Sequence, residues 1–141
     1  MKQTPHRIKR KGSSRIKKSH LAKADAVFSK RILARDKHCQ FPNCKQTKRL
    51  TCSHYIGRAV KSTRFDEENC IALCLFHHFF SKDLGFEFQK QTKVKHGYDG
   101  QYTLFMRSRL GTTRFNALVK RAKKKLTLTR EYLEQLIATL K

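Results

Sequence analysis

The fold is decided by residues 39–78, CQFPNCKQTKRLTCSHYIGRAVKSTRFDEENCIALCLFHH. This stretch holds all five cysteines of the 141-residue chain. Cys39 and Cys44 form one close pair with turn residues between them, and Cys74 and His77 form a second pair. Two such pairs supply four ligands of the kind that tetrahedral zinc prefers. We therefore predict a structural zinc site that ties the two ends of the stretch together.

The remaining cysteines leave alternatives open. Cys70 and Cys74 could supply the second zinc-binding pair, or all five thiols could be buried small side chains. We expect Cys52 and Cys70 to be buried in this way. The odd number of cysteines, with no secretory signal at the start of the chain, favours metal binding in a reducing cytoplasm over a disulfide framework.

The hydrophobic pattern predicts a small α+β core. Residues 24–35 carry an apolar stripe at three-to-four spacing, which predicts a helix before the first cysteine pair. Residues 49–56 and 70–73 predict short strands, and the polar residues 57–68 predict a loop between them. A second helix is expected from residue 75 to about residue 85.

Three polar residues of this core follow one another in the order His, Asn, His. His54 ends the first predicted strand, Asn69 begins the second, and His78 lies on the following helix. This order resembles the HNH (ββα-metal) nuclease family, in which two strands and a helix hold one catalytic divalent metal. The resemblance implies a small zinc-stabilised ββα-metal core with flanking helices and a helical C-terminal tail. His77 stands where that family usually has its last zinc-binding cysteine.

The resemblance extends over roughly residues 24–141 and is closest to phage recombination nucleases of the lambda NinG/Rap type. It rests on CSHYIGRAVKSTRFDEENCIALCLFHH and on the tail sequences FMRSRLGTTRFNALVKRAKKK and TREYLEQLIATLK. It implies a DNA endonuclease that acts on branched or recombination intermediates, such as Holliday junctions or D-loops, and a homodimer would suit such a substrate. Two alternatives remain: a non-catalytic zinc-stabilised nucleic-acid-binding module, and a sequence-specific homing or restriction HNH endonuclease.

Phosphodiester hydrolysis accounts for the residue types. A neutral imidazole can take a proton from water, so we assign His54 as general base, with its pKa lowered by the surrounding positive charge. The resemblance implies that Asn69 orients this base and that His78 binds a catalytic Mg²⁺ or Mn²⁺. Adjacent helical residues diverge by about 100°, so His77 and His78 can serve two different metals. Alternatively, both histidines bind one zinc or pack in the core.

The residue before His54 departs from the family pattern. Many HNH proteins have Asp or His there as a metal ligand, whereas this chain has Ser53. A serine hydroxyl is a poor ligand, so the catalytic metal would depend on His78, phosphate and water, with Ser53 as an optional ligand. The nearby acids are alternative ligands, although the first three are expected to cap or shape the loop: Asp66, Glu67, Glu68 and Asp83.

The charge predicts a nucleic-acid partner. The net charge is +23 and the isoelectric point is about 10.4, and a surface of this kind attracts polyanions. The alternative for each basic residue is a solvated surface position. The expected DNA contacts lie in the interstrand loop and in a basic run near the C-terminus: Arg58, Lys61, Arg64, Lys120, Arg121, Lys123, Lys124 and Lys125.

The chain is expected to have three parts. Residues 1–23 predict a flexible basic arm, residues 24–85 the nuclease core, and residues 86–141 a basic helical region. The last region predicts three helices, over residues 101–110, 113–125 and 130–140, with Gly111 as a C-terminal cap and Thr129 as an N-cap. No apolar run approaches the length needed to cross a bilayer, so we expect a cytoplasmic protein without membrane contact.

Overall fold

A computed structural model of the chain describes residues 16–80 and 101–141. The predicted arm (1–23) therefore lies mostly outside the described residues, as do the end of the helix predicted at 75–85 and residues 86–100. The elements follow one another in this order: α1 (Lys18–Asp36), β1 (Leu50–His54), the 3₁₀ turn η1 (Glu67–Asn69), β2 (Cys70–Cys74), the π-helical turn η2 (Phe76–Phe80), α3 (Gln101–Ala122) and α4 (Arg130–Leu140).

The two strands form an antiparallel hairpin, as the sequence predicts. Leu50 pairs with Cys74 at one end and His54 pairs with Cys70 at the other. The first strand is shorter than predicted, because the backbone of Ile56 is hydrogen-bonded to the side chain of Asn69 and not to a partner strand. The sheet of the described chain thus ends where the long loop to η1 begins.

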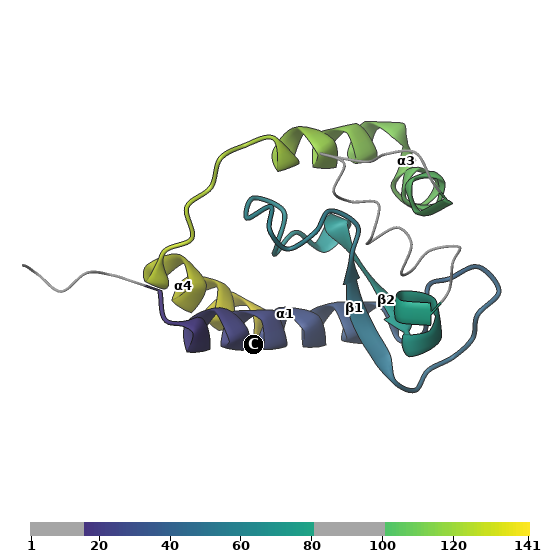
Figure 1. The fold of residues 1–141 in the computed structure, drawn as a ribbon, viewed down its shortest axis with the longest axis horizontal. Coiled ribbons are helices and arrows are strands. Elements are labelled where there is room, and N and C mark those ends of the chain that lie inside the picture. Colours follow the sequence, from purple (N-terminus) through teal and green to yellow (C-terminus); the bar gives the residue numbers. More distant parts are fainter. Residues whose placement is uncertain (1–15, 81–100) are drawn as a thin grey trace, which may run out of the picture.

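The hairpin lies between two helical layers, with α1 on one face and α3 on the other (Figure 1). Side chains of a strand alternate between faces. Cys52 and Cys70 accordingly pack with Phe28 and Ile32 of α1. The opposite face packs on α3 through a second set of buried residues, which includes Tyr55, Ile71, Leu73, Met106 and Leu118. Burial on both faces explains why a sheet of only two strands can be stable here.

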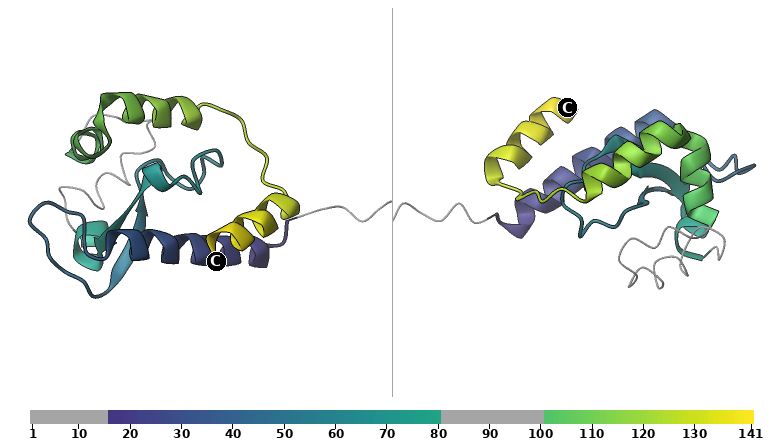
Figure 2. Two further views of the ribbon diagram at one scale, coloured as in Figure 1. Left: turned by 180° about the vertical axis from the view of Figure 1, so that it is seen from behind. Right: turned by 90° about the horizontal axis from the view of Figure 1, so that it is seen from above.

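The helix boundaries reflect local sequence and long-range packing. Gly111, with φ 75°, interrupts α3, so the two predicted helices are two halves separated by a residue that glycine suits. Thr129 caps α4 by accepting a hydrogen bond from the Tyr132 N–H at 3.1 Å. The first helix is longer than predicted, because α4 packs beside its first half through Leu133 and Ile137 (Figures 1 and 2).

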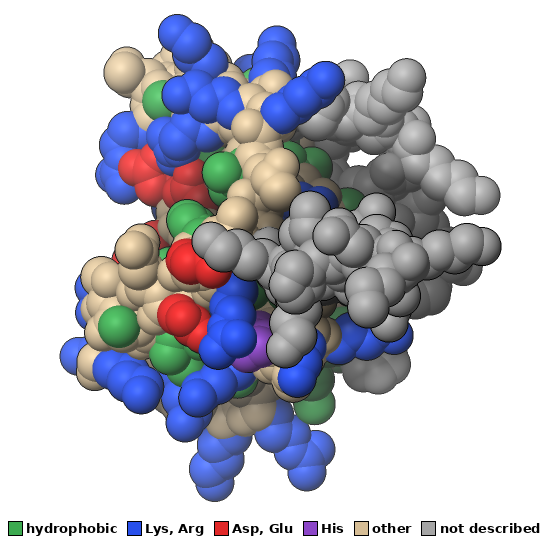
Figure 3. Space-filling view, turned by 90° about the vertical axis from the view of Figure 1, so that its left-hand side faces the viewer, with side chains coloured by type: hydrophobic (Ala, Val, Ile, Leu, Met, Phe, Trp, Pro, Cys, Tyr) green, Lys and Arg blue, Asp and Glu red, His purple; other side chains and the backbone are tan. Residues whose placement is uncertain are grey.

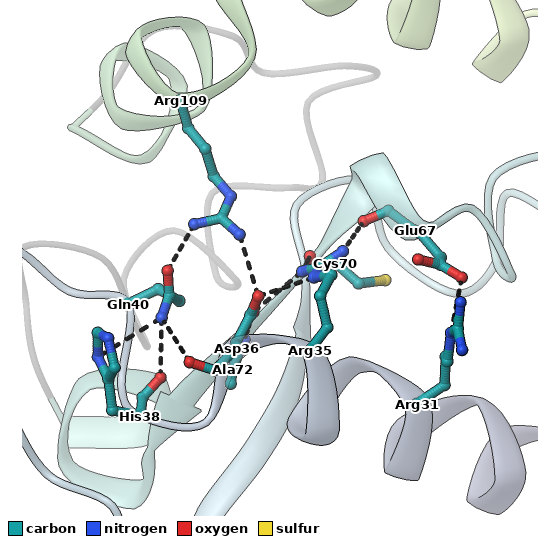
Figure 4. A network of polar contacts seen from close by, with 9 residues as sticks. All are labelled: Arg31, Arg35, Asp36, His38, Gln40, Glu67, Cys70, Ala72 and Arg109. Carbon is teal, nitrogen blue, oxygen red and sulfur yellow. Dashed lines mark hydrogen bonds and ion pairs between the residues drawn. The ribbon is translucent and has the colours of Figure 1, made fainter.

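Asp36 connects three elements at the end of α1. Its buried carboxylate accepts hydrogen bonds from Arg35, from the Ala72 N–H of β2 at 2.8 Å, and from Arg109 of α3 at 3.1 Å (Figure 4). Arg35 also donates to the Cys70 carbonyl at 2.7 Å. Each part of this network satisfies groups that burial would otherwise leave unpaired.

The observed fold is therefore a small α+β domain with a two-stranded antiparallel sheet. Within residues 16–80 and 101–141, no helix combines the length and the apolar character needed to cross a membrane.

Candidate metal centre and histidine pocket

The four predicted zinc ligands come together in space. Donor atoms of Cys39, Cys44, Cys74 and His77 all lie within 4.8 Å of one another. Nδ1 of His77 lies 3.4 Å from Cys39 Sγ and 3.2 Å from Cys74 Sγ. Three sulfurs and one imidazole nitrogen at these separations fit a tetrahedral ion such as zinc. The predicted convergence of the two pairs is confirmed, and His77, not Cys70, completes the group.

Local backbone geometry builds this centre. The Cys44 N–H donates to the Phe41 carbonyl at 3.0 Å, and Asn43 adopts φ 65°, which closes a tight turn between the first two cysteines. The Cys39 N–H donates to the Gln46 carbonyl at 2.8 Å and fixes the turn at its base. Cys74 is the last residue of β2, so the hairpin delivers the third sulfur.

Two further features describe the ligands of this centre. The ring of Phe41 stacks on the ring of His77, with centroids 3.9 Å apart and 6° between the planes, which fixes the orientation of the imidazole. Burial raises the pKa of the Cys39 thiol to about 11. The buried thiol therefore stays protonated at neutral pH unless a cation takes the place of its proton.

A second group of side chains surrounds a pocket at the edge of β1. His54 and His78 both line this pocket of about 350 Å³, together with Asp25 of α1 and Arg58 of the loop. Burial lowers the pKa of His54, and the charge of Arg58 adds to the effect, while a hydrogen bond to the Arg64 carbonyl opposes it. The pKa of His54 is thus lowered as expected, with burial as the larger cause and the charge of Arg58 as a smaller one. His54 is therefore neutral at pH 7.

The hydrogen bonds of His54 determine which nitrogen is free to accept a proton. Its Nε2 lies 2.9 Å from the Arg64 carbonyl oxygen, which can only accept, so Nε2 carries the hydrogen. Nδ1 of His54 consequently holds the lone pair. Arg64 is itself held by Asp25 through two hydrogen bonds of 2.6 and 3.0 Å.

The same reasoning fixes His78 in the opposite tautomer. Thr51 donates its only hydroxyl proton to the Leu73 carbonyl at 3.0 Å, and its oxygen lies 2.6 Å from Nδ1 of His78. Nδ1 must therefore donate to Thr51, which leaves the lone pair of His78 on Nε2. Burial, Arg58 and His54 together lower the pKa of His78 to about 4, so its imidazole is available as a neutral ligand.

Asn69 acts on His54 indirectly, through the loop that follows β1. Its Oδ1 accepts from the Ile56 N–H at 2.7 Å, and its Nδ2 donates to the carbonyls of Ile56 at 2.8 Å and Thr63 at 2.9 Å. Asn69 is fully buried. It fixes both ends of the loop segment 56–63, which leads directly into Arg64, and the carbonyl of Arg64 is hydrogen-bonded to His54. Its influence on His54 therefore passes through the backbone of this loop.

The structure separates Ser53 from the two histidines. Its side chain is buried on the α3 face of β1, where its hydroxyl lies 3.0 Å from the Tyr102 hydroxyl. It is not among the residues that line the pocket.

The predicted loop acids of the described chain are engaged elsewhere. Asp66 caps η1 by accepting from the Glu68 N–H at 3.0 Å, which agrees with the expected capping role. Glu67 pairs with Arg31, and Glu68 pairs with Arg114. Asp83 lies outside the described residues.

Two of the predicted DNA contacts are committed to internal ion pairs. Arg64 binds Asp25 and is largely buried, with 15% of its side chain exposed. Arg121 binds Asp66 and Glu68, each at 2.6 Å. The sequence gives no sign of this difference from the neighbouring basic residues. Both pairs hold the interstrand loop against the rest of the domain.

The other predicted DNA contacts are brought toward one another. Arg121 docks the end of α3 on the loop, and the Ser62 hydroxyl donates to the Ala122 carbonyl at 3.4 Å. The six other predicted contacts are exposed, and in the part of the chain that the structure describes they form no ion pair. We refer to these residues as the basic strip: Arg58, Lys61, Lys120, Lys123, Lys124 and Lys125. Figure 3 shows one face of the molecule, where Lys and Arg form the upper and lower borders and the carboxylates lie between them.

One grouping was missed from the sequence. Cys52 and Cys70 are buried as expected, but donor atoms of both also lie within 4.8 Å of a donor atom of His54. Cys52 and His54 lie two residues apart on a strand, which places them on one face, and this spacing is the only signal in the sequence that could have suggested the group.

A search against protein-family models, curated proteins and solved structures gives no significant match to this chain.

Proposed function

We propose that this protein is a metal-dependent DNA endonuclease of the HNH type. The observation that carries the proposal is the pair of histidines with fixed, opposite tautomers on one pocket. Hydrolysis of a phosphodiester needs a base for the attacking water and a cation near the phosphate. His54 has the free nitrogen of a base, and His78 has the free nitrogen of a ligand.

His54 acts as the general base through Nδ1. The Arg64 carbonyl holds Nε2–H and prevents the imidazole from rotating, and the Asp25–Arg64 pair fixes that carbonyl in turn. The lowered pKa keeps His54 in its base form at neutral pH. Asn69 contributes by fixing the loop, and a base that is held in place transfers the proton more efficiently than a mobile one.

His78 contributes an imidazole Nε2 to the catalytic Mg²⁺ or Mn²⁺. The described lining of the pocket has one carboxylate, Asp25, and Arg64 already neutralises it. The remaining ligands would come from water and phosphate oxygens, so we expect weak metal binding before DNA is present. When bound, the ion supplies charge stabilisation for the phosphate and the leaving oxygen. Ser53 would take part only if its side chain turned away from Tyr102.

The basic strip supplies DNA affinity. Arg58 lines the pocket, and its guanidinium suits a phosphate oxygen pair next to the scissile bond. The lysines at the end of α3 extend the positive surface beyond the loop. Contacts of this kind read the backbone and not the base sequence, which fits a structure-selective enzyme acting on branched recombination intermediates.

A supercoiled-plasmid nicking assay with Mg²⁺ or Mn²⁺ tests the activity. We expect the wild type to nick the plasmid and His54→Ala to lower the rate by about 10²–10⁴-fold, while DNA binding is retained. Equal, undetectable nicking by both proteins with intact binding would favour the alternative, a zinc-stabilised nucleic-acid-binding module.

The DNA preference needs a separate comparison. A panel of linear duplex, single strand, flap and four-way junction of matched length should show faster cleavage of the branched members. Rapid cleavage of one duplex sequence from a random pool, with no preference for junctions, would instead indicate a homing or restriction enzyme. Analytical ultracentrifugation with and without a junction tests the expected homodimer.

A further inference from the structure

The two groups of potential metal ligands lie at opposite ends of the hairpin. Cys74 of the first group pairs with Leu50 at one end, and Cys70 pairs with His54 at the other. Cys52 lies two residues before His54 and therefore on the same face of β1. The second group is thus separate from the four-residue centre, and it shares no ligand with it.

The second group has the composition of a soft-metal site. Two thiols and one imidazole have donor atoms within 4.8 Å of one another. Ligand atoms around a tetrahedral zinc are about 3.4–3.8 Å apart, given zinc–sulfur and zinc–nitrogen bonds of about 2.3 and 2.0 Å, so only small side-chain movements are needed. Three protein ligands would leave one position open.

The group is also accessible. Cys70 is 1% exposed, but Cys52 and His54 line the pocket that also contains Arg58 and His78. An ion can therefore enter through the pocket and meet the sulfur of Cys52 and the imidazole before it reaches Cys70. The exposed Arg58 at the pocket does not prevent this, because two thiolates neutralise the charge of a divalent ion.

We propose that Cys52, His54 and Cys70 form a second binding site for a thiophilic divalent ion of the zinc and cadmium class, and that occupation of this site silences His54. The metal binding does not depend on the proposed nuclease activity, whereas the silencing rests on it. A bond from the ion to the free nitrogen of His54 removes the lone pair that would accept the proton from water. Zinc bound at the four-residue centre would then stabilise the enzyme, whereas additional zinc bound at the second site would inhibit it.

Titration of the full-length protein with Cd²⁺, after its zinc has been removed with a chelator and in the presence of a phosphine reductant, tests the binding. Cadmium thiolates absorb in the ultraviolet, and the first site offers three sulfurs while the second offers two. We expect two steps, the second with about two-thirds of the amplitude of the first. Cys70→Ala should remove the second step, or at least halve it, and leave the first. His54→Gln should keep its amplitude and weaken its affinity at least tenfold.

The controls separate specific from adventitious binding. His20→Gln removes an imidazole on α1 that belongs to neither group, and both steps should remain. If Cys70→Ala does not fold, as judged by circular dichroism with one equivalent of Cd²⁺, Cys52→Ala serves in its place. Saturation of the wild type at one equivalent, or a second step that is unchanged in the cysteine variants, would overturn the proposal.

A second measurement addresses the silencing. Nicking activity is followed through the second equivalent, with each protein compared with its own activity at one equivalent. The wild type should lose activity in parallel with the second absorbance step, and Cys52→Ala should lose much less. A wild type that binds two ions but never nicks DNA would contradict the nuclease proposal and leave the metal site established. A wild type that nicks equally well with both sites filled would contradict the silencing.

Discussion

Asn69 and Ile56 exchange two hydrogen bonds, one from the Ile56 N–H at 2.7 Å and one to the Ile56 carbonyl at 2.8 Å. The amide side chain thereby replaces a neighbouring strand at the point where β1 ends. Asn69 donates a third hydrogen bond to the Thr63 carbonyl. This buried residue therefore holds the loop in place just before Arg64, whose carbonyl is bonded to His54.

Substitution of Asn69 should therefore destabilise the loop more than its size suggests. Asn69→Ala leaves the N–H and the carbonyl of Ile56 without their side-chain partners, whereas the Thr63 carbonyl keeps the Asp66 N–H at 3.3 Å. Each unpaired buried group costs about 1–3 kcal/mol unless water reaches it. We expect a fall of several kcal/mol in the free energy of unfolding, measured by urea denaturation of the zinc-loaded protein. Asn116→Ala, on the exposed surface of α3, is the control and should change stability little. A similar loss in both variants would contradict this account of Asn69.

Thr51 should control the metal dependence of activity. Thr51→Val keeps the shape of the side chain but removes the oxygen that accepts from Nδ1 of His78. Loss of such a supporting contact typically weakens metal affinity about 10–100-fold. The Mg²⁺ or Mn²⁺ concentration for half-maximal nicking should rise by this factor in Thr51→Val, and Thr51→Ser should resemble the wild type. An unchanged metal requirement in the valine variant would exclude His78 as the ligand.

The four-residue centre should hold about one zinc per chain in protein purified without added metal. Removal of the zinc with a chelator, or the change Cys74→Ser, should abolish cooperative thermal unfolding, since structural zinc sites bind with apparent free energies of about 10–16 kcal/mol. Atomic absorption and circular dichroism provide the two measurements. Cys52→Ser is the matched control and should retain this zinc. A folded wild type that contains no zinc would refute the ligand assignment.

Asp36 should make stability depend on pH. Burial alone would raise its pKa, but hydrogen bonds from Arg35 and the Ala72 N–H, with the charges of Arg35 and Arg109, lower it below the ordinary value. A carboxyl with a lowered folded-state pKa contributes stability above the unfolded pKa of about 3.9, and that stability is lost as pH falls through the folded value.

The variant Asp36→Asn isolates this contribution from acid release of zinc. At pH 7 the wild type should be more stable than Asp36→Asn by about 1.5–3 kcal/mol, the usual range for hydrogen bonds to a charged group. The difference should shrink as the pH falls below about 4. A stability difference that stays constant from pH 7 to pH 3, measured by urea denaturation, would mean that the charge of Asp36 is not responsible.

The lysines that directly follow α3 should govern the salt dependence of DNA binding. Each phosphate contact contributes about 0.9 to the slope of log K against log salt. The triple change of Lys123, Lys124 and Lys125 to Gln should lower the slope by up to about three such contributions, measured by fluorescence anisotropy. Arg130→Gln removes a charge already paired with Glu134 and should change the slope much less. Equal changes per residue would show that net charge, and not the basic strip, sets the affinity.

The sequence by itself determined the local elements and the four-residue metal group. Apolar spacing located the helices, Gly111 and Thr129 marked boundaries that the backbone keeps, and the spacing of Cys39, Cys44, Cys74 and His77 specified which donors converge. These features depend on neighbours along the chain or on the strict chemistry of metal ligands, so they can be read without knowledge of the packing.

Only the tertiary structure decided how polar side chains are used. Arg64 and Arg121 have the same charge as the exposed residues of the basic strip, yet each is paired with a carboxylate brought from elsewhere in the chain. Ser53 faces α3, while Cys52 and Cys70 meet His54 on the other face. Strand alternation separates two faces, but it cannot say which helix covers each face or which charges meet there, because those depend on how distant segments pack against the hairpin.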